Sequence, residues 1–461
     1  MKLAIIGASI GQYPLCLKAR ELGVETFCFA WEKGAICKDI VDHFYPIDIF
    51  DTEKIVRICK EEGVQGVASN GSEVTALVQS HVAEILKLNA TSYKVFKLLQ
   101  NKYYVRQCLD DIKELCQPKY YKYQGKDEGV YPCVVKPCFG GGKKGVTYVD
   151  TKELFVKAIA YASKEDDKEI LVEEYIEGDE LSVETISYHG KHEVVQITQK
   201  DKSQPPHFAE TGHHQPANIS KQLWGDICDV VTKILTKISF TDGASHIELK
   251  YNASGIYVIE VNPRGGGENI SSVLTYLSSG VDYLDAMIKV ALNNFKGVRS
   301  VKKASPAYSG IYFLCKQSSA NFPLFTMTSD ESWIVEKKIE KSFRLEESVT
   351  NHDKKTYLIY QSNHKIGPIT PHVFLLKDFN CGKTKFIDFI KLWCLQNNIF
   401  YDKKEYDEIW NSSIILAYII NDEIKSCVTI KKQQSKIYLL EKTPENIIEE
   451  ISSAKQRIMK K

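Results

Sequence analysis

The 461-residue sequence predicts an α/β protein built from about three successive domains. Its first 90 residues alternate short apolar strands with helices, which is typical of a Rossmann-like parallel sheet covered on both faces. Residues 91–300 contain glycine-rich turns and paired strands instead, and these favour a separate unit. Residues 301–461 mix strands with helices, and we expect them to form a mixed C-terminal domain of open role.

Within the first domain, the apolar pattern predicts four strands and three helices. The strands are expected at 2–6, 24–29, 44–47 and 64–69, and the helices at 14–22, 52–62 and 72–88. The first strand ends at a turn from Gly7 to Gly11, which lacks the three-glycine pattern of a dinucleotide-binding loop. We therefore predict no nicotinamide cofactor there and favour a tight turn without ligand.

The later elements are read from the same periodicities. Helices are expected at 93–109, 151–163, 221–238, from about 270, and at 383–397; strands are expected at 131–137, 146–149, 170–175, 181–187, 192–198, 308–315, 414–420 and 426–431. A polar stretch containing prolines, residues 201–216, interrupts the strands and is expected to be a loop.

Composition narrows the partners and the compartment. The chain carries 60 Lys and Arg against 59 Asp and Glu, so its formal net charge of +1 provides no general attraction to nucleic acid or to an anionic membrane. Its 13 scattered cysteines include no Cys-x-x-Cys pair, which is typical of a reducing compartment. No apolar run reaches the length of a signal sequence or a membrane span. We expect a cytoplasmic protein with no nucleic-acid or membrane partner.

Two strands flank an Asn-Ala-Ser-Gly turn near residue 252 and predict an antiparallel hairpin. If Tyr251 lies opposite Tyr257, then Glu248 lies opposite Glu260 and His246 lies opposite Asn262. The reverse side of this hairpin then collects the apolar residues Ile247, Leu249, Tyr251, Tyr257, Ile259 and Val261.

Opposed carboxylates destabilise a sheet, so a cation is expected to offset them. Mg²⁺ characteristically binds through one or two carboxylates together with substrate phosphates, and Arg264 follows close by to meet an anion. The alternative is a hairpin whose acidic side chains simply face water.

A second candidate site combines Lys136, at the end of a predicted strand, with a glycine-rich turn at residues 140–145. Glycines allow backbone N–H groups to approach phosphate oxygens closely, and a lysine adds a mobile positive charge. Lys144 stands where a P-loop requires Ser or Thr, so the turn is not a P-loop. A glycine-rich hairpin turn without ligand remains the alternative.

These motifs occur in an order that resembles the ATP-grasp superfamily. A strand with Lys136 and a glycine-rich hairpin comes first, then Glu-Glu-Tyr-Ile at 173–176 and Glu180, and finally the Glu-x-Asn-x-Arg pattern at 260–264. The resemblance runs from about Thr91 to residue 300, and it implies a small lobe over about 115–185 and a large lobe over about 186–300. The α/β domain at 1–90 matches the domain that usually precedes an ATP-grasp fold.

The resemblance implies roles for each set of residues. Lys102 and Lys136 would grip the ATP phosphates, and the loop with Gly140, Gly141, Gly142 and Gly145 would close over the triphosphate. The segment Glu173, Glu174, Tyr175 and Ile176 would form the hinge that contacts adenine, and Glu180 would hold the ribose hydroxyls. Glu248, Glu260 and Asn262 would bind Mg²⁺, with Mn²⁺ as an alternative metal, and Arg264 would stabilise the transferred phosphate.

The stretch Phe208–Pro216 resembles the substrate-side loop of the L-amino-acid ligase branch. By that likeness Glu210 would pair with an amino group, and His213 would contact the acyl group or assist proton removal; two polar surface histidines are the alternative. Glu184 is a weaker candidate for the same pocket. The glycines at 265–267 could present N–H groups to a substrate carboxylate or form a plain helix entry. Gln199 and Lys200 give no convincing match to the bicarbonate-binding residues of the biotin-carboxylase branch, and no biotin-carrier motif is visible.

The resemblance thus predicts an ATP- and Mg²⁺-dependent carboxylate–amine ligase. It would activate a small-molecule carboxylate, with an amino acid as the favoured candidate, as an acylphosphate and join it to an amine. One alternative is a carboxyphosphate or formylphosphate enzyme of the purine or carboxylase type, and another is a nucleotide-binding module without turnover. The likeness is also compatible with a homodimer.

Overall fold

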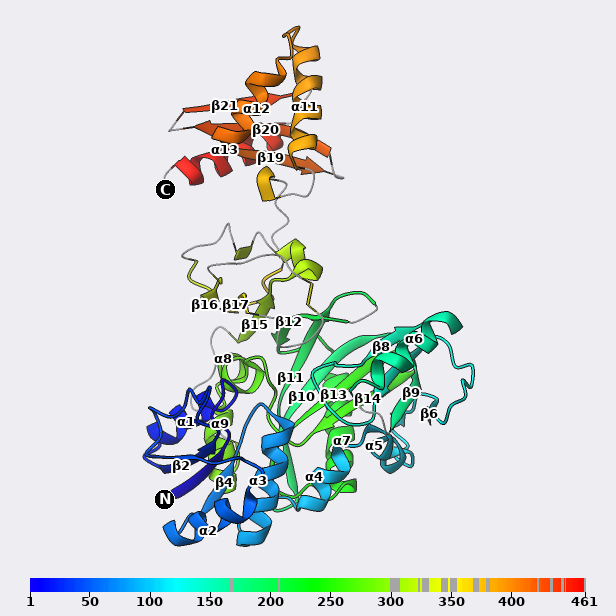
Figure 1. The fold of residues 1–461 in the computed structure, drawn as a ribbon, viewed down its shortest axis with the longest axis vertical. Coiled ribbons are helices and arrows are strands. Elements are labelled where there is room, and N and C mark those ends of the chain that lie inside the picture. Colours follow the sequence, from blue (N-terminus) through cyan, green and yellow to red (C-terminus); the bar gives the residue numbers. More distant parts are fainter. Residues whose placement is uncertain are drawn as a thin grey trace. The chain divides into compact units, whose positions relative to one another are not determined.

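The computed structural model describes residues 1–165, 169–205, 208–298, 307–321, 324–325, 331–340, 347–348, 355–367, 373–378, 382–420, 423–431, 434–440, 443 and 445–459. The chain divides into two compact units, Met1–Gly367 and Pro368–Lys461 (Figure 1). The predicted mixed α/β class is confirmed. The finer division into three domains stays a prediction. The first unit extends past the expected boundary near residue 300.

The N-terminal sheet is parallel, as predicted, and its strands lie in the order β3-β2-β1-β4. The strands are β1 (Lys2–Ile6), β2 (Glu25–Ala30), β3 (His43–Pro46) and β4 (Gly66–Ala68). Leu3 and Ile5 pack toward one hydrophobic cluster, whereas Ala4 and Ile6 pack toward another. Because successive side chains alternate between faces, this sheet is buried on both sides.

Helices supply both covers of this sheet. α1 (Tyr13–Glu21) and α9 (Tyr283–Ala291) contribute to one cluster, and α2 (Thr52–Glu62) and α3 (Glu73–Leu86) contribute to the other. α9 comes from a distant part of the sequence, so it ties the N-terminal sheet to the middle of the chain (Figure 1). The carboxyl ends of β1 and β4 are adjacent, and the Gly7–Gly11 turn and residues 70–73 lie there.

The small lobe is a four-stranded sheet in the order β6-β9-β7-β8. Its strands are β6 (Tyr120–Lys122), β7 (Cys133–Pro137), β8 (Thr147–Val149) and β9 (Ile170–Glu174), and α6 (Lys152–Ala162) packs on one face. The turn between β7 and β8 is the predicted glycine-rich loop. It therefore extends from two neighbouring antiparallel strands.

The large sheet has nine described strands in the order β16-β17-β15-β12-β11-β10-β13-β14-β5. They are β5 (Leu115–Cys116), β10 (Asp179–Tyr188), β11 (Lys191–Lys202), β12 (Glu210–Gln215), β13 (Gly243–Asn252), β14 (Gly255–Asn262), β15 (Tyr308–Phe313), β16 (Ile334–Lys338) and β17 (Tyr357–Ser362). The amphipathic helix α7 (Lys221–Lys237) packs on this sheet through the largest hydrophobic cluster. β15, β16 and β17 follow residue 300, so the sheet continues beyond the expected boundary of the large lobe.

Three local predictions were wrong. The expected loop at 201–216 contains β12, which pairs with β11 and β15 and is buried at all six positions. The expected helix at 93–109 is two helices, α4 (Tyr93–Leu99) and α5 (Lys102–Leu109), because the Asn101 side chain caps the second. The helix expected from residue 270 opens as a π-helical turn, η1 (Ile270–Leu274), before α8 (Thr275–Ser279).

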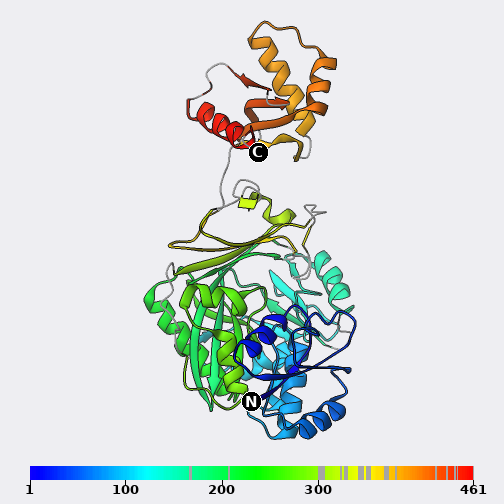
Figure 2. The ribbon, with the colours of Figure 1, turned by 90° about the vertical axis from the view of Figure 1, so that its left-hand side faces the viewer.

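The second unit is an antiparallel sheet in the order β18-β19-β20-β21 with helices on both faces. Its strands are β18 (Val373–Leu375), β19 (Ile414–Ile420), β20 (Glu423–Lys431) and β21 (Gln434–Leu439). α11 (Gly382–Gln396) and α12 (Lys403–Ser412) share one hydrophobic cluster, whereas α13 (Glu445–Met459) joins the cluster on the other face (Figure 2). Within the described residues, no helix has the length and apolar character that a membrane span needs.

Candidate functional site

A cavity of about 1160 Å³, including its open mouth, lies between the small-lobe sheet, the glycine-rich loop and the β13–β14 hairpin. Most of the predicted site residues line it together: Lys102, Lys136, Gly140, Gly141, Gly142, Glu173, Glu174, Tyr175, Ile176, Glu180, Glu210, Glu248, Glu260 and Arg264. Three predicted residues, Gly145, His213 and Asn262, lie outside the described lining.

The hairpin brings its carboxylates together as predicted, by an unexpected route. Glu248 pairs with Glu260 and His246 pairs with Asn262, but Tyr251 lies opposite Ile256, not Tyr257. The turn is shorter than predicted, and a β-bulge at Ile259 restores the register beyond it.

The bulge also changes which side chains face the cavity. Tyr257 and Ile259 were expected on the apolar side, but both line the cavity. Ile256 and Val258 take the buried positions instead. The two errors in the predicted hairpin, in the turn and in the missing bulge, therefore cancel at the two glutamates.

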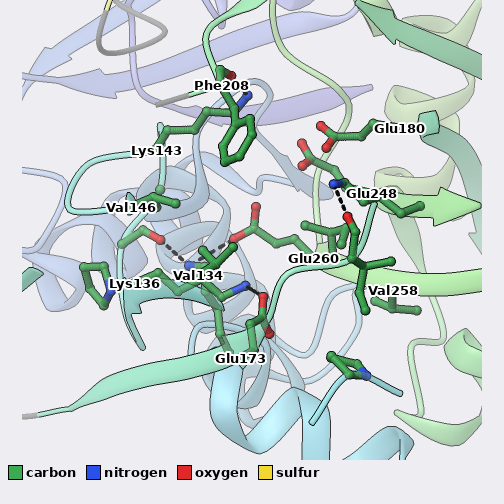
Figure 3. Close-up of a pocket in the computed structure, with 18 of the residues that line it drawn as sticks. Val134, Lys136, Lys143, Val146, Glu173, Glu180, Phe208, Glu248, Val258 and Glu260 are labelled. Carbon is green, nitrogen blue, oxygen red and sulfur yellow. Dashed lines mark hydrogen bonds and ion pairs between the residues drawn. The ribbon is translucent and has the colours of Figure 1, made fainter. Parts of the chain in front are cut away.

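Two lysines reach into the cavity, Lys136, which is buried, and Lys102, which is half-buried. Lys102 Nζ lies 3.0 Å from Glu260 Oε1 and donates to the Gly140 carbonyl. Lys136 pairs with Glu173, and the two side chains point toward one another in Figure 3. Burial lowers the pKa of Lys136, and Glu173 opposes this effect only in part. Burial also acts to lower the pKa of Lys102, but Glu260 outweighs it, so the pKa of Lys102 is raised. Glu173, predicted in the adenine hinge, thus balances charge for Lys136.

Arg106 is a buried cation that sequence reasoning missed. Its guanidinium lies 2.9 Å from Glu173 and also donates to the Val258 carbonyl, so it joins the small lobe to the hairpin. The available signal was its spacing: Lys102 and Arg106 are four residues apart on α5 and share a helix face. Burial acts to raise the pKa of Glu173, but Arg106 and Lys136 outweigh this effect and lower it.

Lys200 lies at the centre of three carboxylates and also went unassigned. Its Nζ is 2.8 Å from Glu210, 2.8 Å from Glu248 and 3.7 Å from Glu180. Burial favours a neutral amine, but these carboxylates raise the pKa of Lys200 well above its ordinary value. Burial acts to raise the pKa of Glu248, but Lys200 outweighs it and holds that pKa well below its usual range. Glu248 is therefore charged and balanced by a neighbouring ammonium group.

The glycine-rich loop reaches the large sheet through a lysine. Lys143 Nζ lies 3.0 Å from Glu210 Oε1 and donates to the Phe208 carbonyl at 2.9 Å (Figure 3). Gly140, Gly142 and Gly145 all have positive φ, which explains why the loop needs glycine. Gly145 supports the loop from outside the lining, since a Cβ there would lie 2.8 Å from the Pro137 ring.

An aromatic shelf forms the far end of the cavity. Tyr175 stacks on Phe208 with ring centroids 5.6 Å apart, and Lys250 lies 4.4 Å over the Tyr175 ring while donating to the Ile176 carbonyl. Burial lowers the pKa of Lys250 to about 8. Flat rings beside backbone groups can accept a planar heterocycle.

Glu180 and Glu174 differ in what they contact. Glu180 lines the cavity and pairs with Lys202 as well as Lys200. Glu174 accepts from the Lys119 backbone N–H at 3.1 Å, which holds the neighbouring chain in place.

The end of β14 leads into the glycine run at 265–267. Asn262 Nδ2 lies 3.4 Å from Glu260 Oε2, so the predicted metal-binding amide and one carboxylate are neighbours. Arg264 lies 3.5 Å from Glu73 of α3, a cavity-lining acid that sequence reasoning missed. Burial, followed by the nearby Glu260, raises the pKa of Glu73.

Glu184 does not face the cavity. It is fully buried, accepts from the Gly266 N–H at 2.9 Å and contacts His246 Nδ1. His246 Nε2 in turn lies 3.3 Å from Glu248. Glu184 therefore links the glycine run to a predicted metal-binding carboxylate. Because its N–H is engaged by Glu184, Gly266 is not available for a substrate carboxylate.

β12 carries Glu210 and His213 into the interior. The His213 side chain is fully buried, and its Nε2 lies 2.7 Å from Glu268 and 3.6 Å from Glu210. Neither of the two adjacent histidines is a surface residue, because His214 is bound between Asp201 and Tyr360. The alternative of polar surface histidines is therefore wrong.

Comparisons with known proteins match one domain of this chain and parts of several relatives. Residues 129–273 match the profile of the ATP-grasp domain. The chain is 30% identical over 166 residues to the uncharacterized protein y4rH of Sinorhizobium fredii, which covers 35% of this chain and 34% of that protein. It is 27% identical over 300 residues to carbamoyl phosphate synthase large chain of Clostridium perfringens, covering 60% and 27%. The chain thus spans about a third or less of these relatives.

The fold is shared with a solved structure as well. The L-amino acid ligase from Bacillus licheniformis superposes with a TM-score of 0.63 at 21% identity, over 78% of this chain and 92% of that one. This likeness extends beyond the matched domain and includes most of the first compact unit.

Proposed function

Since this chain carries an ATP-grasp domain, we propose that it is an ATP- and Mg²⁺-dependent carboxylate–amine ligase. It activates the carboxylate of a small molecule, with an amino acid as the favoured candidate, as an acylphosphate. An amine then displaces the phosphate to form an amide or peptide bond. The observation that carries the proposal is the pairing of Glu248 with Glu260 at the floor of a cavity that Lys102 and Lys136 also line.

The donor set fits a hard divalent cation bound together with phosphates. Glu248, Glu260 and Asn262 would hold Mg²⁺, because all three offer oxygen atoms from two paired strands. The bound metal would neutralise charge on the phosphates of ATP. Lys102 and Lys136 would bind the same phosphates, and Lys102 already contacts the glycine-rich loop that would cover them.

The other predicted residues divide between nucleotide and substrate. Tyr175 and Ile176 would receive adenine on the aromatic shelf, and Glu180 would hold the ribose after exchanging its contact with Lys202. Arg264, at the start of the glycine run, would stabilise the transferred phosphate. Glu210 would bind the amine side of the reaction, near the position that Lys143 and Lys200 now occupy.

A second candidate is an enzyme that forms carboxyphosphate or formylphosphate. The match to carbamoyl phosphate synthase large chain, over 60% of this chain, supports it. This second candidate would use the same ATP and Mg²⁺ site as the ligase and would differ only in the acid that is activated. A nucleotide-binding module without turnover would share the same site as well.

An ADP-release screen separates these candidates. Purified protein is incubated with ATP, Mg²⁺ and all pairs of the common amino acids, with parallel arms containing bicarbonate or formate and an amine. We expect ADP release that requires both an amino acid and an amine. Release that requires bicarbonate or formate and ignores amino acids selects the second candidate. Thermal stabilisation by ATP without any ADP release selects the binding module.

A further inference from the structure

A carboxylate that no motif suggested lies beside the predicted amine-binding residues. Glu268 follows the glycine run, and its Oε2 lies 2.7 Å from His213 Nε2. His213 Nε2 lies 3.6 Å from Glu210 Oε2. One ring nitrogen of His213 and one carboxylate oxygen from each glutamate all lie within 4.8 Å of one another. The two glutamates arrive from different elements, one from β12 and one from the turn after β14, so tertiary structure alone brings them together.

The three side chains differ in how far a substrate could reach them. The side chain of His213 is 0% exposed and that of Glu210 is 3% exposed, whereas that of Glu268 is 17% exposed. His213 Nδ1 is buried and has no hydrogen-bond partner among the described residues. A histidine that contacts Glu268 through Nε2 and has a buried Nδ1 cannot exchange a proton with a substrate. It can orient the glutamate that it contacts.

Charge decides which kind of ligand this cluster favours. Two ammonium groups already lie within 3.0 Å of Glu210, those of Lys143 and Lys200. These two ammonium groups repel a divalent metal placed among the three residues about twice as strongly as they repel a monovalent cation. A monovalent ammonium group suits the position better, because it can donate hydrogen bonds to carboxylates while adding a single charge.

We propose that Glu268 is the catalytic residue that binds the ammonium group of the amine substrate and accepts its proton, with His213 as its positioning residue. This inference rests on the proposed ligase function. The Glu268 carboxylate takes one proton from the ammonium group, and the nitrogen lone pair attacks the carbonyl carbon of the acylphosphate. The carbon–nitrogen bond forms, the bond from that carbon to the phosphate oxygen breaks, and phosphate leaves with the electron pair. The leaving phosphate takes the second amine proton, and Glu268 returns the first to solvent.

Hydroxylamine provides a test that separates the two half-reactions. At neutral pH it is an unprotonated nucleophile, so it traps an acylphosphate as a hydroxamate without needing a base. Wild type and Glu268→Gln are compared for amide formation from amino-acid pairs and for hydroxamate formation from the same acids. We expect the variant to lose amide formation by about 10²- to 10⁴-fold, the usual contribution of a general base, while hydroxamate formation changes little. Glu53→Gln, at an exposed position of α2, is the matched control.

The positioning role of His213 has its own readout. His213→Gln retains an N–H donor and should keep more amide formation than His213→Leu, with both variants forming hydroxamate like the wild type. A merely structural role would lower both products together.

Each outcome bears on a distinct claim. If hydroxamate and amide formation fall equally in Glu268→Gln, the role inferred for Glu268 is wrong, whereas the ligase proposal is unaffected. An unchanged rate of amide formation would overturn that role too, as would a raised Mg²⁺ requirement in both assays, which would indicate a metal at the cluster. A wild-type protein that forms neither product from any acid would overturn the ligase proposal itself, and this inference with it. Retained hydroxamate formation also shows that the variant is folded.

Discussion

Gly266 offers a sharp test of the contacts behind the predicted metal site. A Cβ at this position would lie 2.7 Å from Glu184 Oε1, 2.8 Å from His246 Nδ1 and 3.0 Å from Ile270 Cγ2. Ordinary contact begins at 3.4 Å, so Gly266→Ala requires Glu184 to retreat by about 0.7 Å, the difference between 3.4 Å and 2.7 Å. Both glutamate and histidine are buried and contact one another, so neither can move alone.

Overpacking of this kind costs about 1–3 kcal/mol, and we expect Gly266→Ala to lower the free energy of unfolding by that amount. The adjacent Gly267→Ala is the matched control, because a Cβ there meets nothing within 4 Å. It should be neutral, or more stable by up to about 1 kcal/mol through a less flexible unfolded chain.

Urea midpoints of the two variants measure the difference, provided that the slope of the transition is unchanged. Because His246 contacts Glu248, Gly266→Ala should also slow ADP release, by up to about 10²-fold for a displacement near 1 Å. Equal midpoints for the two variants would refute the packing argument.

Three further predictions address the charged groups. Glu260→Gln should abolish ADP release, by at least about 10²-fold, with every substrate pair; retained turnover would remove the hairpin from the site. Burial acts to lower the pKa of His246, but the Glu184 carboxylate outweighs it and raises that pKa to about 9. The charged His246 therefore contributes its full stability below the unfolded pKa near 6.5, and this contribution is lost as pH rises through 9. Unfolding free energies of wild type and His246→Asn should therefore converge by about 3 kcal/mol over that window, and parallel curves would contradict this. Arg106→Met removes a buried partner of Glu173 and should cost about 3–5 kcal/mol in denaturant unfolding, whereas the exposed Arg57→Met should cost less than about 0.5 kcal/mol.

Local sequence patterns predicted the hairpin carboxylates for a reason that can be stated. Strand alternation assigns a face to each residue, and the Asn-Ala-Ser-Gly turn limits the register to a few choices. The bulge at Ile259 was invisible, because Val258 and Ile259 are both apolar and either could face the core. The assignment of Tyr257 and Ile259 to the wrong face follows directly from that ambiguity.

Residues that balance charge were not predictable in the same way. Lys200 was noted in the sequence without a role, and the structure surrounds it with acids from β10, β12 and β13. β12 itself reads as a polar loop, because its histidines and glutamate look like surface residues until β15 arrives from a hundred positions away to cover them. Polarity indicates exposure only when no distant partner satisfies the polar groups.

The sequence by itself determined the alternating strands and helices of the N-terminal domain, the glycine-rich loop and the facing glutamates, since each can be read from periodicity within an element or across one turn. Tertiary structure alone decided the cluster of Glu210, His213 and Glu268, the extension of the large sheet past residue 300, and the ion pairs of Arg106. Those features join segments far apart in the chain. Contacts of that kind depend on how whole elements pack, and short-range periodicity carries no information about them.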